Sequence, residues 1–336
     1  MPDLADRKVE LRSSSIDSAE DWVNTVVWSP DGGSVYAACS DGAVIALDCA
    51  DGEAREVHRH EGPATSLDVS VNGSVASGGH DGTLRSGGQS ILLGEGDWVE
   101  RVSWRPDGER LAAACGRVVH MLDRDGVVQA TSRAAEATVT CLGWHPRGIN
   151  LAAGSYGGVE LLRGRDATNE ARLPWKGSIL ELAISPDGRR LAHGNQDATV
   201  HFWDVAKRRE LHMTGYPRKV RELAWRDDTR FLATGGGTTV TVWDFSGRGP
   251  EGSIPLELDQ HQMPVTWLGF QPGKPLLASA ADDGLLILWT PRRSGSVAAA
   301  VACDEPLTCA AWSPDGRKIA VGGAHGKVEV FEVAGS

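Results

Sequence analysis

Short runs of apolar residues alternate along this chain with residues that favour tight turns. Eight times, an apolar strand ends in an aromatic or aliphatic residue, and a turn similar to Ser-Pro-Asp-Gly follows. These anchor residues lie 35 to 45 residues apart, and they are Trp28, Val69, Trp104, Trp144, Ile184, Trp225, Phe270 and Trp312. A period of about 40 residues predicts one supersecondary unit that is repeated around a closed array. Such arrays usually bind rather than catalyse.

The seventh repeat shows the pattern within one unit. Residues 265–270 predict a first strand and residues 275–279 a second, and a tight turn at residues 282–284 leads into a third strand that ends at Trp289. Turn residues bracket each apolar run, which is typical of short antiparallel strands. The variable stretch before the next anchor supplies a fourth strand. Because such a sheet must pack against copies of itself, we expect an all-β protein with a single domain over residues 1–336.

The third strands of several repeats resemble those of the WD40 family of β-propellers, and the resemblance covers nearly the whole chain. Trp203-Asp204 and Trp243-Asp244 are the dipeptides that name this family. Blades of the family often carry a hydrogen-bonded His–Ser/Thr–Asp–Trp tetrad that ties their four strands together. The resemblance implies that the seventh repeat holds this structural tetrad, as His261, Ser279, Asp283 and Trp289.

Eight anchors predict eight blades, although seven is the commonest number in the family and is the alternative. Only five residues follow Phe331, too few for a fourth strand in the last repeat. In this family an N-terminal strand commonly completes the last blade and removes an exposed sheet edge. We expect residues 7–14 to be that closing outer strand, so the predicted fold is an eight-bladed WD40 propeller.

Charge and cysteine content limit which partners and which cellular compartment we expect for this protein. The chain has 34 Lys and Arg against 45 Asp and Glu, a formal net charge of −11, which argues against general binding to nucleic-acid backbones or anionic lipids. No apolar run approaches membrane-spanning length, and the first eight residues do not resemble a secretory signal. The six cysteines do not suggest a disulfide framework. We expect a reduced, cytoplasmic protein, most simply a monomer.

Catalytic motifs are largely absent from the sequence. We find no phosphate-binding loop, no metalloprotease His pair, no Cys-x-x-Cys and no nucleophile elbow. We therefore predict a non-catalytic protein–protein interaction scaffold with no cofactor. An enzyme that uses the channel mouth is one alternative, with Glu100 as the acid/base candidate beside Lys219 and Arg221.

WD40 proteins usually meet partners on the face formed by the loop before each first strand and by the turn between the second and third strands. We call this the channel-mouth face. At the positions six and four residues before the anchors, small residues dominate, and the informative exceptions, together with a nearby tyrosine, are Trp22, Trp98, Glu100, Lys219, Arg221 and Tyr216. Aromatic residues beside Arg favour binding hot spots, although the two tryptophans could instead only cap the packing between blades. Two positive charges in an acidic chain predict an acidic peptide or an anionic small ligand as partner.

A metal site is the remaining alternative. His58, His60 and His80 gather in the second repeat, where three imidazoles could hold zinc with one position open. Against this, His60 is in register for a tetrad role with Ser77 and Asp81. Residues 215–225, 234–237 and 242–244 look like a group of bacterial WD40 proteins, some of which are associated with metal-chaperone GTPases. A metal-related or small-ligand-binding accessory protein therefore stays open.

Overall fold

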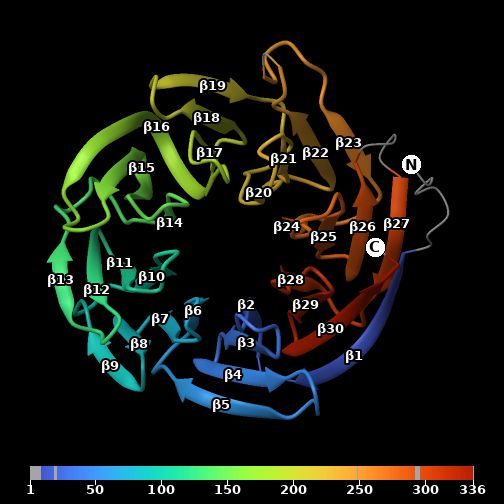
Figure 1. The fold of residues 1–336 in the computed structure, drawn as a ribbon, viewed down its shortest axis with the longest axis horizontal. Coiled ribbons are helices and arrows are strands. Elements are labelled where there is room, and N and C mark those ends of the chain that lie inside the picture. The colour runs from blue at the N-terminus through green and yellow to red at the C-terminus, as the bar shows by residue number, and fades with distance from the viewer. Residues whose placement is uncertain (1–8, 19–20, 248, 292–295, 336) are drawn as a thin grey trace.

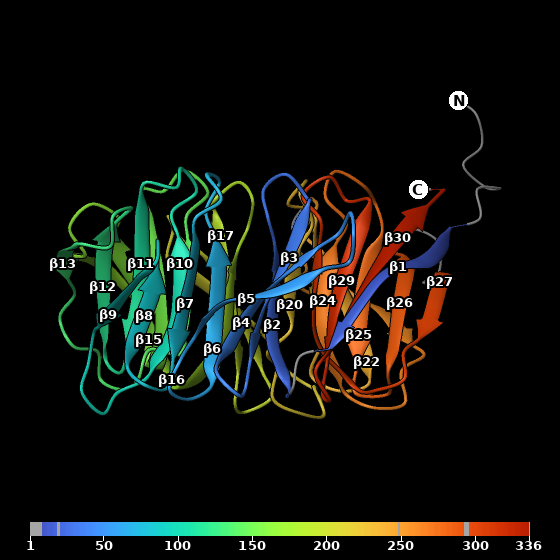
Figure 2. The same cartoon turned by 90° about the horizontal axis from the view of Figure 1, so that it is seen from below.

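The computed structural model describes residues 9–18, 21–247, 249–291 and 296–335. These residues form thirty β-strands in seven antiparallel sheets, which stand radially around a central axis (Figure 1). Seen from the side, the connecting loops gather at two opposite faces of a disc (Figure 2). Among the described residues, no helix has the length and apolar character that crossing a membrane requires.

Three of the four-stranded sheets come first along the chain. Their strands are β2 (Val23–Trp28), β3 (Ser34–Cys39), β4 (Ala43–Asp48) and β5 (Ala54–Arg59); β6 (Ala64–Val69), β7 (Val75–Gly79), β8 (Thr83–Ser86) and β9 (Gln89–Leu92); and β10 (Val99–Trp104), β11 (Arg110–Cys115), β12 (Val118–Asp123) and β13 (Val128–Thr131).

Three more four-stranded sheets lie in the second half of the ring. Their strands are β20 (Leu223–Trp225), β21 (Phe231–Thr234), β22 (Thr239–Asp244) and β23 (Leu256–Asp259); β24 (Val265–Phe270), β25 (Leu277–Ala281), β26 (Leu285–Thr290) and β27 (Ser296–Ala302); and β28 (Leu307–Trp312), β29 (Lys318–Gly323) and β30 (Lys327–Ala334) with β1 (Glu10–Ser18).

The seventh sheet is larger and covers the fourth and fifth repeats together. It has six strands, which are β14 (Cys141–Trp144), β15 (Asn150–Arg163), β16 (Asn169–Ile184), β17 (Arg190–Asn195), β18 (Val200–Asp204) and β19 (Arg209–Met213). The expectation of eight blades, each a sheet of its own, is therefore wrong. Counted by hydrogen-bonded sheets, the propeller has seven blades, the alternative that the family resemblance left open.

The shared sheet arises because β16 is one uninterrupted strand of 16 residues. Its first part pairs with β15, where Leu173 lies opposite Val159, and its last part pairs with β17, where Ile179 lies opposite Asn195. No turn separates the two parts, so hydrogen bonding continues from one repeat into the next. The eight anchors still each end a strand, which are β2, β6, β10, β14, β16, β20, β24 and β28. The eightfold repeat of the sequence is thus kept in the strands, while the sheets number seven.

β15 also serves as two strands of the repeat, because its first part pairs with β14 and its later part with β16. The amide of Gly164 donates to the carbonyl of Ile149 at 2.9 Å, so the residues at the two ends of this strand lie side by side. The chain bends back at Gly157 and Gly158, whose φ angles of 96° and 137° favour glycine.

The ring closes between the last sheet and the first sheet. β1 pairs antiparallel with β30, from Glu10 opposite Ala334 to Ser18 opposite Lys327. This places an N-terminal strand on the outer edge of the last sheet, beside the end of the chain (Figures 1 and 2). The closing strand was predicted at residues 7–14, of which Arg7 and Lys8 lie outside the described residues.

The hydrophobic core lies between neighbouring sheets. One cluster joins Trp28 and Val35 of the first sheet to Val328 and Val330 of β30, and similar clusters fill the other gaps. Four anchor tryptophans also donate from indole Nε1 to a carbonyl of the preceding repeat, namely Trp28 to Ala311 at 2.8 Å, Trp144 to Ser103 at 3.0 Å, Trp225 to Ala183 at 3.2 Å and Trp312 to Gly269 at 2.9 Å. Tryptophan suits the anchor position because it fills the gap and satisfies a partly buried carbonyl of the preceding repeat.

Candidate functional site

The two exceptional tryptophans of the channel-mouth face are exposed. Trp22 directly precedes β2 and Trp98 directly precedes β10, and their exposed fractions are 44% and 49%. The β6–β9 sheet lies between them in the ring, so the structure does not bring the two indoles together (Figure 1). Trp98 instead stacks on His80, which lies in the turn between β7 and β8, with ring centroids 3.8 Å apart and planes 10° apart. This stack holds a large, exposed aromatic surface in a defined place.

The residue four before each anchor has a structural role in most repeats. In five repeats, its side chain donates to a backbone carbonyl of the next repeat, as Asn24 to Ala64 at 2.9 Å, Thr65 to Val99 at 3.3 Å, Thr140 to Ile179 at 2.6 Å, Thr266 to Leu307 at 2.7 Å and Thr308 to Val23 at 2.6 Å. This explains why small polar residues dominate there. In the described part of the chain, no such bond comes from Glu100, Leu180 or Arg221. Glu100 and Arg221 therefore carry charge where the ring normally uses a linking hydroxyl or amide.

The loop before β20 carries the basic candidates. Lys219 and Arg221 are both exposed, and no ion pair between described residues involves either side chain. Between them, Val220 is fully buried and its amide donates to the carbonyl of Asn195 at 3.1 Å. The loop is thus fixed to the fifth repeat while both cations face solvent.

Tyr216 anchors the same loop on its other side. Its hydroxyl bonds Thr234 at 2.8 Å and accepts from Trp243 Nε1 at 3.1 Å. Burial is the main cause of the raised pKa of Tyr216, so the phenol stays neutral. A cavity of about 380 Å³ opens beside it, between this loop and strands β22 and β23, and Pro217 and Glu257 also line it. Tyr216 therefore acts mainly as a structural support, and its ring forms one wall of a cavity.

Glu100 lies apart from the basic loop. It sits half-buried on β10, on a different side of the ring from β20 (Figure 1). Its neighbour Arg101 pairs with Glu181 of β16 at 3.5 Å. The structure thus does not place Glu100 beside Lys219 and Arg221, the grouping on which acid/base chemistry at the channel mouth would depend.

The seventh repeat contains a continuous chain of buried hydrogen bonds. His261 Nδ1 lies 3.1 and 3.2 Å from the carboxylate oxygens of Asp283, and its Nε2 lies 2.7 Å from Ser279 Oγ. Trp289 Nε1 donates to the same hydroxyl at 2.8 Å. The four side chains come from the loop before β24, from β25, from the β25–β26 turn and from β26, so they join the strands of one sheet.

The second repeat replaces the missing tryptophan with a histidine. His60 bonds Ser77 at 2.8 Å and Asp81 at 3.1 Å, as in the seventh repeat, while His58 Nε2 bonds Ser77 at 2.7 Å where Trp289 would donate. Burial is the main cause that lowers the pKa of His58 to about 4, so this imidazole is neutral at pH 7. His80 is occupied with Trp98. Of the three histidines considered for zinc, His58 and His60 thus share Ser77 as a partner, while His80 is stacked on Trp98.

A scan against protein-family models gives the decisive comparison. The model described as "WD domain, G-beta repeat" matches residues 12–45, 53–86, 171–204, 208–244, 252–290 and 300–332, together more than half of the chain. The chain belongs to the WD40 family. The third and fourth repeats lie outside these matches, although their anchors Trp104 and Trp144 follow the same period.

Several known proteins are similar to this WD40 chain. WD repeat-containing protein 55 of Bos taurus is 28% identical over 207 residues, which cover 58% of this chain and 52% of that protein. THO complex subunit 3 of Arabidopsis thaliana is 27% identical over 203 residues, with coverage of 57% and 62%, and Protein HIR1 of Yarrowia lipolytica is 26% identical over 191 residues, with coverage of 47% and 18%. The chain thus covers less than two thirds of the length of each relative. All three are eukaryotic, so they do not support a bacterial type.

Among solved structures, the crystal structure of the computationally designed Ika8 protein matches 96% of this WD40 chain and 100% of its own, with a TM-score of 0.81 and 20% identity. At this identity the likeness concerns the fold alone.

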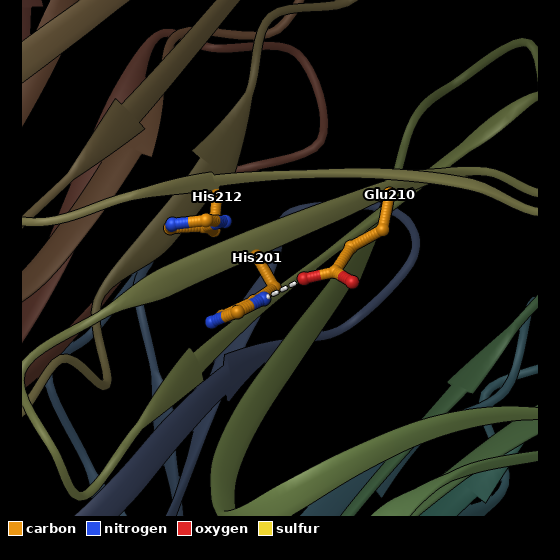
Figure 3. Close-up of side chains that lie close together, drawn as sticks. All are labelled: His201, Glu210 and His212. Carbon is orange, nitrogen blue, oxygen red and sulfur yellow. Dashed lines mark hydrogen bonds and ion pairs between the residues drawn. The ribbon is translucent and has the colours of Figure 1, made fainter.

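One cluster that the sequence analysis missed lies on the outer strands of the fifth repeat. It consists of His201, Glu210 and His212, whose possible ligand atoms all lie within 4.8 Å of one another (Figure 3). Within the described ranges, this is the group of three or more His, Cys, Asp or Glu side chains that lie close enough to hold a metal ion. The signal was present in the sequence, because Glu210 and His212 are two apart and so share one face of a strand. His201 joins them only through the pairing of β18 with β19.

The cysteines of the WD40 ring are all free. Burial is the main cause that raises the pKa of Cys39 and of Cys309 to about 12. These thiols stay protonated at neutral pH and are poor nucleophiles.

Proposed function

We propose that this WD40 propeller is a protein-interaction scaffold that binds an acidic segment of a partner protein on its channel-mouth face. The observation that carries the proposal is the pair of exposed cations Lys219 and Arg221, which no ion pair of the described chain neutralises. Family membership supports a role in protein assembly, and one relative is by its name a subunit of the THO complex.

The two cations differ in what they offer a partner. Arg221 presents a planar guanidinium that suits bidentate pairing with a carboxylate, whereas Lys219 is a compact point charge. The fully buried Val220 holds the loop between them, which reduces the conformational entropy that binding would cost. The whole chain carries a net charge of −11, so most of its surface repels an acidic partner, whereas Lys219 and Arg221 attract it. This difference in charge favours one binding position.

The exposed tryptophans supply apolar contact area on the same face. Trp98 is held by its stack on His80 and offers a rigid aromatic surface of the kind that dominates binding energy at interfaces. Trp22 offers a second such surface beyond the β6–β9 sheet. A partner that reaches both the basic loop and Trp98 must extend across the ring, which suits an extended peptide segment.

A binding titration tests the proposal. A fluorescent Glu-rich peptide carrying one Trp or Phe is titrated with the protein, and a peptide with Gln in place of Glu is the ligand control. Lys219→Glu combined with Arg221→Glu should weaken binding of the acidic peptide at least about tenfold, because each reversal turns an attraction into a repulsion. Lys207→Glu, on the outer β18–β19 hairpin and 76% exposed in its side chain, should leave binding unchanged.

The aromatic contribution is tested in the same assay. Trp98→Ala should weaken binding by about tenfold or more, while Ile254→Ala, at a residue 96% exposed but away from this face, should have no effect. Equal affinity for the Glu and Gln peptides, or equal loss in the Lys207→Glu control, would contradict the proposed site.

A further inference from the structure

Three imidazoles form a row across strands β17, β18 and β19 of the fifth repeat. His193 of β17 lies opposite His201 of β18, which lies opposite His212 of β19. The centroids of neighbouring rings are 5.2 and 5.3 Å apart. Glu210 is two residues before His212, and its carboxylate therefore faces the same side of the sheet (Figure 3).

His193 is the structural member of this row. Its Nδ1 lies 2.9 Å from Asn195 Oδ1, and its Nε2 accepts from Trp203 Nε1 at 3.3 Å. Both ring nitrogens are thus engaged, and the imidazole substitutes for the tetrad serine of other repeats. The other side chains of the cluster are His201, Glu210 and His212, and among them His201 of β18 is paired with Glu210 of β19.

His201 is chemically unusual because it is buried and only half satisfied. Its side chain is 1% exposed, and its Nδ1 is hydrogen-bonded to Glu210. Its Nε2 is buried without a hydrogen-bond partner. Trp175 covers the ring at a centroid distance of 3.7 Å, and Trp175 Nε1 is likewise buried without a partner. The ring nitrogen that faces Glu210 is Nδ1, so Nδ1 is the atom that His201 offers to the cluster, while Nε2 points away from the carboxylate (Figure 3).

The cluster is closed on one side and open on the other. His201 lies buried under Trp175, whereas His212 is exposed and Glu210 is half-buried. An ion could therefore reach the three side chains from solvent.

We propose that His201, Glu210 and His212 bind a divalent metal ion of the zinc class. Two imidazoles and one carboxylate are a donor set that zinc uses, with the fourth position left for water. Ligand atoms in a tetrahedral zinc site lie roughly 3.4 Å apart, given metal–ligand distances of about 2.0–2.1 Å. The present separations of up to 4.8 Å close to this value by rotation of Glu210 and His212, while the buried His201 stays in place.

The site differs from the second-repeat histidines in its geometry. His58 and His60 each bond Ser77, and with His80 they do not form a group of converging ligand atoms in the described structure. The fifth-repeat site also lies on the outer rim of the ring rather than on the channel-mouth face. It is therefore independent of the proposed peptide-binding function.

Calorimetric titration of the metal-free protein with Zn²⁺ tests the site. The wild type should bind one equivalent of zinc with micromolar or tighter affinity. His212→Ala and Glu210→Gln should each lower the affinity at least about tenfold, since loss of even an outer-shell partner costs 10- to 100-fold. Gln keeps an oxygen that accepts from His201, so Glu210→Gln separates loss of the metal ligand from loss of the hydrogen bond.

His325→Ala is the matched control, because His325 is an exposed imidazole, 77% exposed in its side chain, beside Glu305 without a second histidine. It should bind zinc as the wild type does. Co²⁺ provides a second readout, because the visible absorption of a tetrahedral ion should appear in the wild type and vanish in His212→Ala. Absence of zinc binding by the wild type, wild-type affinity in both ligand variants, or a loss confined to His80→Ala would overturn the assignment.

Discussion

Removal of one hydroxyl from the tetrad of the seventh repeat should destabilise the propeller strongly. His261, Ser279 and Trp289 are 0–2% exposed. With Nδ1–H of His261 donating to Asp283, its Nε2 accepts the hydroxyl proton of Ser279, and the oxygen of Ser279 accepts from Trp289. Ser279 therefore acts as donor and acceptor at once, as a hydroxyl can. Ser279→Ala removes both bonds without opening a large cavity.

The magnitude follows from the two groups that lose their partner. A buried polar group left unsatisfied costs about 1–3 kcal/mol, and His261 Nε2 and Trp289 Nε1 are both left so. We expect Ser279→Ala to lower the free energy of unfolding by about 3 kcal/mol. Thr234→Val in the sixth repeat should cost only about 1 kcal/mol, because Tyr216 still accepts from Trp243 at 3.1 Å after the substitution.

Urea unfolding at pH 7.5, followed by circular dichroism and tryptophan fluorescence, measures these differences. Ser90→Ala is the matched control, since Ser90 is exposed on β9, and it should change stability by less than about 0.5 kcal/mol. If Ser279→Ala is no more destabilising than Ser90→Ala, the hydrogen-bond chain does not stabilise the sheet and the reasoning fails. Equal costs for Ser279→Ala and Thr234→Val would refute the argument from the number of unsatisfied groups.

Two further predictions concern acid stability and ring closure. Burial is the main cause that lowers the pKa of both His58 and His193 to about 4, whereas in the unfolded chain they take up protons near pH 6.5. The free energy of unfolding that these neutral imidazoles contribute should therefore be fully present above about pH 6.5 and fall as the pH drops towards 4. The urea midpoint at pH 7.5, 5.5 and 4.5 measures this pH dependence, and His58→Gln should make the midpoint less dependent on pH. An unchanged pH dependence would exclude His58 as a cause. At the junction of last and first repeats, Thr308→Val removes bonds to the carbonyls of Val23 at 2.6 Å and Gly322 at 3.0 Å, and should cost about 1 kcal/mol; wild-type stability in the same assay would mean that this link does not hold the ring.

The partners of several side chains could be predicted from sequence because they depend on register. Equal offsets from an anchor place His60 and His261 at the same point of their repeats, and both bond a serine and an aspartate. Only the structure shows that His58 takes the place of the tryptophan that the second repeat lacks. Tyr216 stands at that same offset in the sixth repeat, where its hydroxyl bonds Thr234. We predicted a role for Tyr216 in partner binding because aromatic residues near cations are typical of hot spots, but its offset from the anchor already indicated this structural position.

Other features could not be reached from the sequence. The position four before each anchor shows a preference for Thr and Asn, but only the structure shows that these side chains bond the next repeat, as Thr140 does with Ile179. Glu100 and Arg221 stand at the same offset, yet the ring separates them. The stack of Trp98 on His80 joins two repeats, and a repeat pattern carries no information about contacts between different repeats.

The sequence by itself determined the repeat, the strands and the turns of this WD40 protein, because apolar periodicity and turn chemistry act between residues that are close along the chain. The tertiary structure decided how many sheets these strands form, since whether hydrogen bonding continues through β16 depends on pairing with strands on both of its sides. It also decided which charged and aromatic side chains meet. His201 reaches Glu210 and His212 only because β18 and β19 pair in one register, and a shift of one residue would turn these side chains to opposite faces of the sheet.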